Sequence, residues 1–404
     1  MSQKALEGIN VLDFSREAAG PITARYLANN GATVVRIESE KAPDGSRSVP
    51  PFGGGSSGLN RSGFQTKFNA DKYGIALNMN HPKAREFVIR LIQWADVVVE
   101  SYLPGQMAKW KLDYNSIRIL KPDIIMCSLS TQGQEGPHAT HPGFGMHLVS
   151  GSGITNILGY PGESPIQPYG AYTDWIAPRF AASYILAALD YRRRTGRGQY
   201  IDLSQFEAVL QFLSPLVLDY SYNGREFQRL GNKSQSACPH EAYRCRGDDR
   251  WCVIAVQTDQ EWQNFCKVIG NPPWTTEPKF STLLERKKNE KELDNLIEAW
   301  TINRNAEEVE KSMQENGVPA GVVKTTEDLF NDPQLKYRHH FWKVNHTEIG
   351  EYSQDGITFH LSKTPGEITR GGNCVGEHTA HVCLQILGMS AEEFVTLDNE
   401  GLFK

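Results

Sequence analysis

Short apolar segments alternate with amphipathic ones along the first 130 residues, and this alternation limits the possible folds more than any other feature of the chain. Strand character is predicted for residues 9–14, 33–38, 96–100 and 123–129, and helical character for residues 22–30 and 83–94. Three consecutive valines occupy positions 97–99, which is typical of a strand buried on both faces of a parallel sheet. Strands that alternate with helices predict a doubly wound α/β sheet.

The character of the chain changes near Gly224. Before it, a long helix is predicted over 176–193, and a Thr-Gly-Arg-Gly-Gln turn over 195–199 leads into a strand at 200–203. After it, the chain is richer in charge and tryptophan up to Asn331, with a predicted strand pair and helices. We therefore expect a large domain over 1–224, a smaller α+β domain over 225–331, and a segment over 332–404 that returns to the large domain.

Composition narrows the class of protein. The chain has 404 residues and a formal net charge of −5, which does not suggest a nucleic-acid-binding protein. No apolar run is long enough to span a bilayer, and the N-terminus lacks a signal pattern. The seven cysteines are scattered without a CxxC pair, which does not fit a zinc site. We expect a soluble cytoplasmic protein that binds no nucleic acid, membrane or metal and keeps its thiols reduced.

The familiar catalytic motifs are absent. The sequence has no GxSxG, HExxH or P-loop, and no GxGxxG after a strand. Residues 53–55 are three glycines, but no suitable helix pattern follows them, so a flexible loop is the better interpretation. Asp174 stands at the start of the long predicted helix, where an aspartate is often an N-cap. The residues alone therefore predict only an α/β enzyme with a small second domain.

A set of short motifs runs in order along the chain and resembles the class III CoA-transferases. The motifs lie at 6–13, 19–21, 31–38, 81–82, 95–105, 121–122, 195–199 and 376–379. The resemblance covers essentially the whole chain. It implies a Rossmann-like large domain and two interlocked chains, either a homodimer or a heterodimer with a related subunit. It also implies that an acyl-CoA and a carboxylic acid are substrates and that no cofactor is tightly bound.

The resemblance assigns the catalytic role to Asp174. Its carboxylate would attack the thioester of the donor, giving a mixed anhydride and CoA thiolate, and the thiolate would return to give an aspartyl-CoA thioester. The acceptor acid would repeat these steps in reverse. Because an anhydride hydrolyses in water, a closing loop is expected over the site.

The resemblance also places the CoA site in the N-terminal half of the chain. Tyr102 matches an aromatic residue near the adenine, and Lys109 matches a cation near the phosphates. The wall of the site is assigned to Arg16, Lys72, Leu77 and Ser101.

Departures from the family pattern point to the acid substrate. Phe144 stands where the related racemases have a histidine, although His141 and His147 flank it, so a proton-transfer enzyme is disfavoured. The formyl-CoA:oxalate branch has a Tyr-Glu pair where Phe144 and Gly145 stand. It also has a glutamine where Ala18 stands, and a glycine-rich loop in place of residues 231–241.

Ala18, Phe144, Gly145 and Trp175 suggest a roomy apolar acid pocket. Such a pocket resembles the branch that acts on aryl-substituted acids such as benzylsuccinate, in aromatic degradation, often with succinyl-CoA as donor. A carnitine-type transferase, an acyl-CoA racemase or isomerase, and a subunit of a heteromeric transferase stay open as alternatives. His240, with Glu241 beside it, either faces the active site from the small domain or caps a strand.

Overall fold

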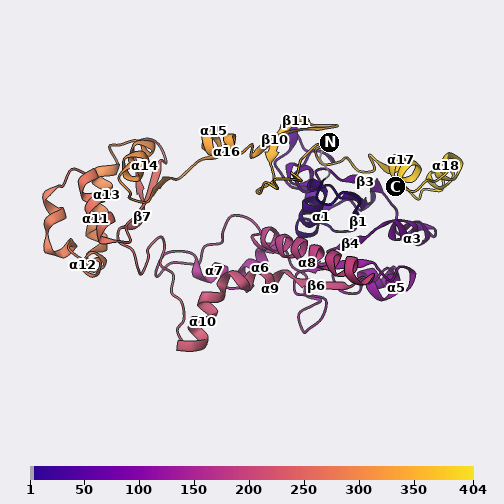
Figure 1. The fold of residues 1–404 in the computed structure, drawn as a ribbon, viewed down its shortest axis with the longest axis horizontal. Helices are drawn as coiled ribbons and strands as arrows, with labels where there is room; N and C mark the ends of the chain where they lie inside the picture. The colour runs from indigo at the N-terminus through magenta and orange to yellow at the C-terminus, as the bar shows by residue number, and fades with distance from the viewer. Residues whose placement is uncertain (1–3) are drawn as a thin grey trace. The chain divides into compact units, whose positions relative to one another are not determined.

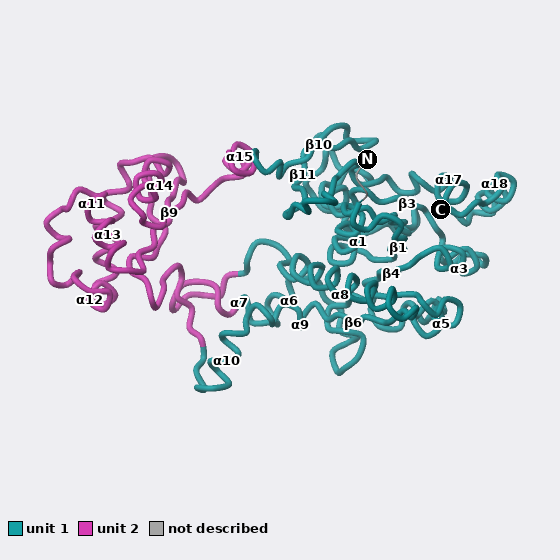
Figure 2. Tube along the Cα trace, in the orientation of Figure 1, with its two compact units in different colours: residues 1–155, 167–226, 336–404 teal, residues 156–166, 227–335 magenta. Residues whose placement is uncertain are grey.

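The computed structural model describes residues 4–404. The chain forms two compact units (Figure 2). The large unit comprises Met1–Thr155, Gln167–Glu226 and Lys336–Lys404, and the small unit comprises Asn156–Ile166 and Phe227–Leu335.

A six-stranded parallel sheet forms the centre of the large unit. Its strands are β1 (Asn10–Asp13), β2 (Thr33–Glu38), β3 (Tyr73–Ala76), β4 (Val97–Glu100), β5 (Ile125–Ser130) and β6 (Tyr200–Ser204). They lie in the order β3-β2-β1-β4-β5-β6. The chain adds β2 and β3 on one side of β1 and then adds β4, β5 and β6 on the other side, so the strand order has a switch point between β1 and β4. The doubly wound α/β class is thus confirmed. In such sheets, ligands bind beyond the carboxyl ends of the strands at this switch point.

Helices cover both faces of the sheet (Figure 1). Successive strand residues point to opposite faces, so Leu12 enters one core and Val11 the other. Leu12 packs with Phe87 of α3 (Ala84–Trp94). Val11 packs in the core that contains Ala177 of α8 (Thr173–Thr195) and residues of α1 (Ala19–Asn29). The remaining helices of this unit's first part are α2 (Gly63–Phe68), α4 (Gln106–Lys109), α5 (Tyr114–Leu120), α6 (Gly145–Gly151), α9 (Gln205–Leu210) and α10 (Ser214–Asn223).

Helix α8 begins three residues earlier than the sequence pattern predicts. Pro178 lies inside it and has no N–H to donate, which weakens the helical pattern just where the helix starts. At the other end Gly196 takes a left-handed conformation with φ 70°, a common helix C-terminus. The first turn, at 173–175, therefore belongs to a continuous helix that leads toward β6.

The C-terminal segment of the large unit contains a hairpin and further helices. The hairpin pairs β10 (Phe341–His346) with β11 (Gly350–Asp355), and the helices are α17 (Thr379–His381) and α18 (Ala391–Asn399), with α16 (Pro333–Tyr337) at the junction of the units. The segment packs against the edge of the sheet near β3: the Gly74 amide donates to His378 Nδ1 at 3.2 Å, and the Asn78 amide donates to the Leu402 carbonyl at 2.8 Å.

The small unit is an α+β body around an antiparallel sheet. Strands β7 (His240–Arg244), β8 (Trp251–Ala255) and β9 (Ala320–Val322) pair in that order. Its helices are α11 (Asp259–Val268), α12 (Leu283–Lys288), α13 (Glu290–Thr301), α14 (Ala306–Glu315) and α15 (Thr326–Asn331), while α7 (Ile154–Ile157) stands at its border. The unit also holds residues 156–166, which the expected boundaries leave in the large domain. Hydrogen bonds from Arg229 to the carbonyls of Asn156 and Glu163 account for this difference.

Residues 4–404 lack two features that would bear on function. No helix there has the length and apolar character needed to cross a membrane. Within the same residues, no three histidine, cysteine, aspartate or glutamate side chains gather as a metal site would require.

Candidate active site

Residues that follow β1 and β4 meet at the switch point of the sheet. The Arg16 amide donates to Ser101 Oγ at 2.9 Å, and this hydroxyl donates to the Arg16 carbonyl at 3.2 Å. Tyr102 is half-buried and packs edge-to-face on Trp110 at 5.3 Å, whereas Lys109 in α4 is exposed. The structure thus brings Arg16, Ser101 and Tyr102 together, with Lys109 on the next helix.

Lys72 and Leu77 have different surroundings from the other residues assigned to CoA. Lys72 is 1% exposed, and its ammonium donates to Asp13 Oδ2 at 2.7 Å, the Pro21 carbonyl at 2.8 Å and Asn69 Oδ1 at 2.9 Å. These three bonds use all of its donors. Leu77 lies fully buried in the core that contains Leu12. Neither side chain offers a surface to a ligand here, so their placement argues for structural roles.

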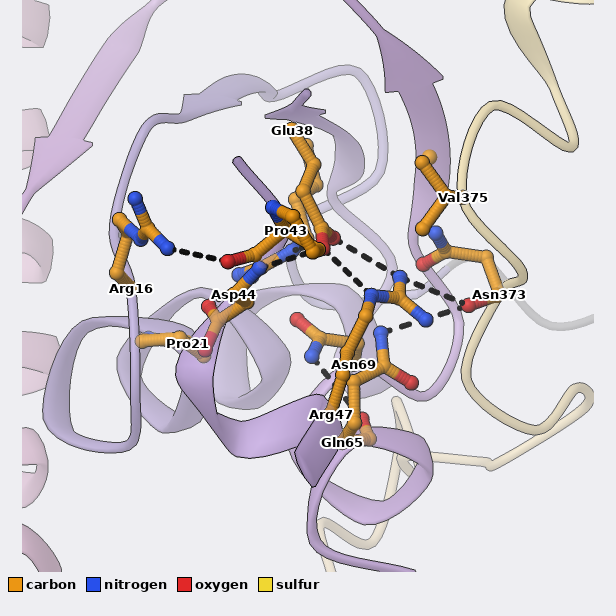
Figure 3. A network of polar contacts seen from close by, with 12 residues as sticks. Arg16, Pro21, Glu38, Pro43, Asp44, Arg47, Gln65, Asn69, Asn373 and Val375 are labelled. Atoms are coloured by element: carbon orange, nitrogen blue, oxygen red, sulfur yellow. Dashed lines mark hydrogen bonds and ion pairs between the residues drawn. The ribbon is translucent and has the colours of Figure 1, made fainter. Parts of the chain in front are cut away.

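A buried network of charges fixes the loops at this end of the sheet (Figure 3). Arg36, fully buried, donates to Asp44 Oδ2 at 2.5 Å and lies 3.8 Å from Asp13 Oδ2. Arg47 contacts both oxygens of Glu38, at 2.5 and 2.9 Å. Although burial alone would raise the pKa of Glu38, the hydrogen bonds and charges of Arg47 and Arg36 hold this pKa at about 2. The network is a rigid support for the residues that follow β1 and β2.

Asp174 lies in the first turn of α8. The N-cap position belongs to Tyr172, so Asp174 is not the helix cap. The side chain is half-buried. Burial, and to a smaller extent the charge of Glu17, raise the pKa of the Asp174 carboxyl to about 7. A carboxyl with a raised pKa near a ligand-binding edge is a common feature of catalytic sites.

Gly145, the first residue of α6, lies close to the Asp174 carboxyl. A Cβ atom at this glycine would lie 2.8 Å from Asp174 Oδ2 and 2.3 Å from the Ala171 Cβ. Thr173 Oγ1 would be 3.0 Å away. These distances are too short for an ordinary side chain, so the backbone of α6 reaches the carboxyl only because residue 145 is glycine.

Gly145→Ala is therefore expected to displace the Asp174 carboxyl and to lower kcat by about 10- to 100-fold, since small misplacements of a reacting group have effects of this order. Steady-state kinetics measures the loss. Gly143→Ala is the matched control: a Cβ there meets only the His147 Cβ, at 3.7 Å, an ordinary contact. Equal kcat values for Gly145→Ala and the wild type would contradict the role of Gly145 in positioning the Asp174 carboxyl.

Aromatic groups adjoin the candidate nucleophile. Trp175 is half-buried, packs edge-to-face on Phe68 at 5.5 Å and has the Lys67 ammonium 4.6 Å from its ring centroid. Phe144, just before Gly145, is 66% exposed. Ala18 is half-buried and directly precedes α1. Trp175 is thus the chain neighbour of Asp174, and Phe144 that of Gly145, while an acid pocket formed by these residues with Ala18 stays a prediction.

His240 belongs to the small unit, where it begins β7. Its Nδ1 lies 2.5 Å from the Asn232 carbonyl oxygen. Glu241 accepts from Asn232 Nδ2 at 2.6 Å and lies 3.3 Å from the Lys233 ammonium. Both side chains thus have partners within the small unit, and a part for either in catalysis stays a prediction.

Glu17 is a residue that the sequence interpretation missed. It takes a left-handed conformation with φ 62°, which is uncommon for a residue with a side chain. Its amide donates to both carboxylate oxygens of Asp44, at 3.2 and 3.1 Å. The one available signal was an acidic residue beside Arg16, in the loop that leads to the 19–21 motif.

Comparison with known proteins adds independent findings. Residues 6–379 match the model of CoA-transferase family III. Over 98% of this chain and 97% of the relative, it is 30% identical to succinyl-CoA–D-citramalate CoA-transferase of Chloroflexus aurantiacus. It is 31% identical to succinyl-CoA:glutarate CoA-transferase of Mus musculus, over 96% of this chain and 87% of the relative. A CAIB/BAIF family protein from Brucella suis has a similar structure, with a TM-score of 0.86, 27% identity, and coverage of 94% and 99% of the two chains.

Proposed function

Because this chain belongs to CoA-transferase family III, we propose that it moves coenzyme A from succinyl-CoA to a dicarboxylic acid, with Asp174 as the nucleophile. The resemblance seen in the sequence motifs is confirmed, and the chain is an enzyme of this class. Its substrates are therefore an acyl-CoA and a carboxylic acid. What we propose beyond this is the identity of the nucleophile, of the CoA donor and of the acceptor acid class.

The observation that carries the assignment is the Asp174 carboxyl itself. This carboxyl lies near the C-terminal ends of the sheet strands, close to Gly145. A carboxylate oxygen attacks the thioester carbonyl, and the C–S bond breaks to give an aspartyl-succinyl anhydride and CoA thiolate. The thiolate attacks the aspartyl carbonyl and releases succinate. The acceptor carboxylate attacks the carbonyl of the resulting aspartyl-CoA thioester and displaces CoA thiolate, which gives an aspartyl-acceptor anhydride. The thiolate then attacks the acceptor carbonyl of this anhydride, so that the acceptor leaves as its CoA thioester and the Asp174 carboxylate is restored. The exchange consumes no proton.

The raised pKa of Asp174 suits this chemistry. A desolvated carboxylate is a stronger nucleophile than one surrounded by water, and the attack spreads its charge onto the thioester oxygen. The edge where Arg16, Ser101 and Tyr102 meet supports CoA binding beside Asp174, with Lys109 available to a phosphate.

Succinyl-CoA is proposed as donor because the names of both relatives state it. Their acceptors, citramalate and glutarate, are dicarboxylic acids, and benzylsuccinate is a dicarboxylic acid with an aromatic substituent. The aromatic groups Trp175 and Phe68 near the nucleophile, with Phe144 exposed beside it, support an acceptor with an apolar substituent. We therefore propose a substituted dicarboxylic acid of the succinate type.

Covalent trapping tests the nucleophile. The protein is incubated with succinyl-CoA, treated with hydroxylamine or borohydride, and examined by intact mass and peptide mapping. A modification confined to Asp174 supports the proposal. Adducts that persist in Asp174→Ala, or none with a panel of acyl-CoAs, would overturn it.

An acceptor panel tests the substrate class. Citramalate, glutarate, benzylsuccinate and carnitine are each offered with succinyl-CoA, and the CoA esters are separated by chromatography. Faster transfer to the dicarboxylic acids supports the proposal, whereas faster transfer to carnitine favours the betaine type. Exchange of the α-hydrogen of an acyl-CoA in D₂O, without transfer, would favour a racemase or isomerase.

We also propose that two copies of this chain form the active enzyme. Support comes from α10, none of whose residues is buried and whose Val217, Tyr220 and Tyr222 side chains are 54–78% exposed. Light scattering is expected to give twice the 45.2 kDa mass of the chain. A stable monomer without activity would instead favour a subunit of a heteromeric transferase.

A further inference from the structure

The segment that follows β4 is tied to the loops on both sides of it. The Tyr102 amide donates to Glu100 Oε2 at 2.7 Å, and the Tyr102 carbonyl lies 3.5 Å from Gln134 Nε2, in the loop after β5. The intervening residue, Ser101, forms hydrogen bonds in both directions with the backbone of Arg16, in the loop after β1. This short segment therefore connects the loops that follow three strands, at the switch point of the sheet.

The strand register places Glu100 at one end of a polar row across the sheet. Glu100 pairs with Ser128 of β5, and Ser128 pairs with Asp202 of β6. Because residues paired in register point to the same face of a sheet, the three side chains are neighbours on one face. The Tyr200 hydroxyl donates to Ser128 Oγ at 3.0 Å, and both Asp202 carboxylate oxygens accept from the Gln134 amide at 3.0 Å. The two ends of the row thus hold the loops after β4 and β5.

Glu100 is an unusual residue for the interior. It is 2% exposed, and among residues 4–404 no cation forms an ion pair with it. Burial, and to a smaller extent the charge of Asp202, raise its pKa to about 7, although the bonds from Ser128 and the Tyr102 amide act in the opposite direction. A buried carboxyl without a cation destabilises the folded state when it ionises. The carboxyl is therefore not explained by stability, and the backbone that it holds is that of Tyr102.

Tyr102 is fixed from two directions. Its ring packs edge-to-face on Trp110 at 5.3 Å, and its backbone is held at the amide by Glu100 and at the carbonyl by Gln134. Tyr102 and Ser101 are half-buried, so both retain exposed surface, whereas Glu100 lies beneath them. A surface that is ordered before a ligand arrives loses less conformational entropy when the ligand binds.

We propose that Glu100 is a positioning residue of the CoA site, which fixes the backbone of Tyr102 so that Tyr102 and Ser101 present a preformed surface to CoA. The inference rests on the proposed function, in which CoA binds at this edge of the sheet. It extends that function to a buried residue that does not touch the substrate. Asp202 supports the same segment through Gln134, so part of the constraint remains when Glu100 is replaced.

Binding of CoA itself, measured by isothermal titration calorimetry, tests the inference without turnover. Glu100→Ala removes the acceptor of the Tyr102 amide, and Kd for CoA is expected to rise about 10-fold, the effect of losing one hydrogen bond to a charged group. Glu100→Gln keeps a neutral acceptor, and its Kd should stay within about threefold of the wild type. In both variants kcat at saturating succinyl-CoA should also stay within about threefold, because Glu100 does not touch the reacting atoms.

Stability separates positioning from a merely structural role. Because the pKa of Glu100 is raised to about 7 from 4.5, its ionisation destabilises the folded state increasingly as pH rises between these values, and Gln removes this cost. Glu100→Gln is thus expected to have a higher Tm than the wild type at pH 8. A lower Tm in Glu100→Gln, together with an unchanged Kd in Glu100→Ala, would show a structural role and overturn the inference.

A buried residue of the small unit provides the matched control. Thr301 is fully buried, and its hydroxyl donates to the Arg244 carbonyl at 2.7 Å. Thr301→Ala should lower Tm and leave Kd for CoA unchanged. If Thr301→Ala raises Kd as much as Glu100→Ala does, the effect is one of general destabilisation and the inference fails.

Failure of the proposed function gives a different pattern. If Asp174 is not the nucleophile, covalent trapping yields no adduct there, but CoA still binds and Glu100→Ala still weakens its binding. If CoA binds elsewhere on the chain, Tyr102→Ala and Glu100→Ala both bind it as tightly as the wild type does. That result would overturn the inference even where trapping at Asp174 succeeds.

Discussion

Asp174→Asn is expected to lower kcat for CoA transfer by at least about 1000-fold, because an amide cannot form the anhydride or the thioester on which the exchange depends. Chromatographic separation of the CoA esters measures the initial rate. The folded protein should survive the change. The pKa of Asp174 is raised to about 7 from 3.8, so the carboxyl destabilises the folded state increasingly as pH rises between these values. Asn removes that cost, and Tm at pH 8 is expected to rise.

A second aspartate on the same helix provides the control. Asp190 is an exposed residue of α8 that pairs with Arg193 and Arg194, each at 2.9 Å. Asp190→Asn removes the same charge without touching the site, and its activity should match the wild type. Transfer by Asp174→Asn at more than a tenth of the wild-type rate would contradict the nucleophilic role.

The sheet could be predicted from sequence because its central strands have a strong local signal. Residues 33–38 match β2 as predicted, and the valines at 97–99 lie in β4, buried on both faces. Strand β3 had no such signal: its four residues, Tyr73–Ala76, come shortly after the short helix α2, and partners far along the chain stabilise them. Helix boundaries failed where one residue decided the outcome. Pro178, for example, weakens the helical pattern near the start of α8, which begins at Thr173 and not at residue 176 as predicted.

Local pattern could not identify the candidate site. Asp174 was found because ordered motifs along the chain resemble a family, whereas its own surroundings suggested only a helix cap. Glu17 was missed because its position depends on a left-handed backbone and on Asp44, and its effect falls on a residue more than 150 positions away. The contacts that position Glu17 exist only after the sheet has formed. Motif position alone also cannot tell whether a lysine faces a ligand or the interior.

Lys72 illustrates that last difficulty, and its replacement should have the largest effect on stability. Lys72→Met leaves the Asp13 carboxylate without its closest cation in the interior, and it removes the donor to the Pro21 carbonyl and Asn69 Oδ1. Breaking a buried ion pair by removing one partner costs about 3–5 kcal/mol. The free energy of unfolding at pH 7, measured with urea, should fall by this amount.

Lys109→Met separates a structural lysine from a ligand-binding one. Lys109 is exposed on α4, and it is the cation proposed to meet a CoA phosphate. Its removal should raise KM for succinyl-CoA by about 3- to 10-fold, as expected for loss of one charge-assisted contact, and leave urea unfolding unchanged. Lys72→Met should show the reverse: a large loss of stability with KM almost unaffected in the folded protein. A raised KM in Lys72→Met without a loss of stability would return Lys72 to the CoA site and contradict the buried network as its main role.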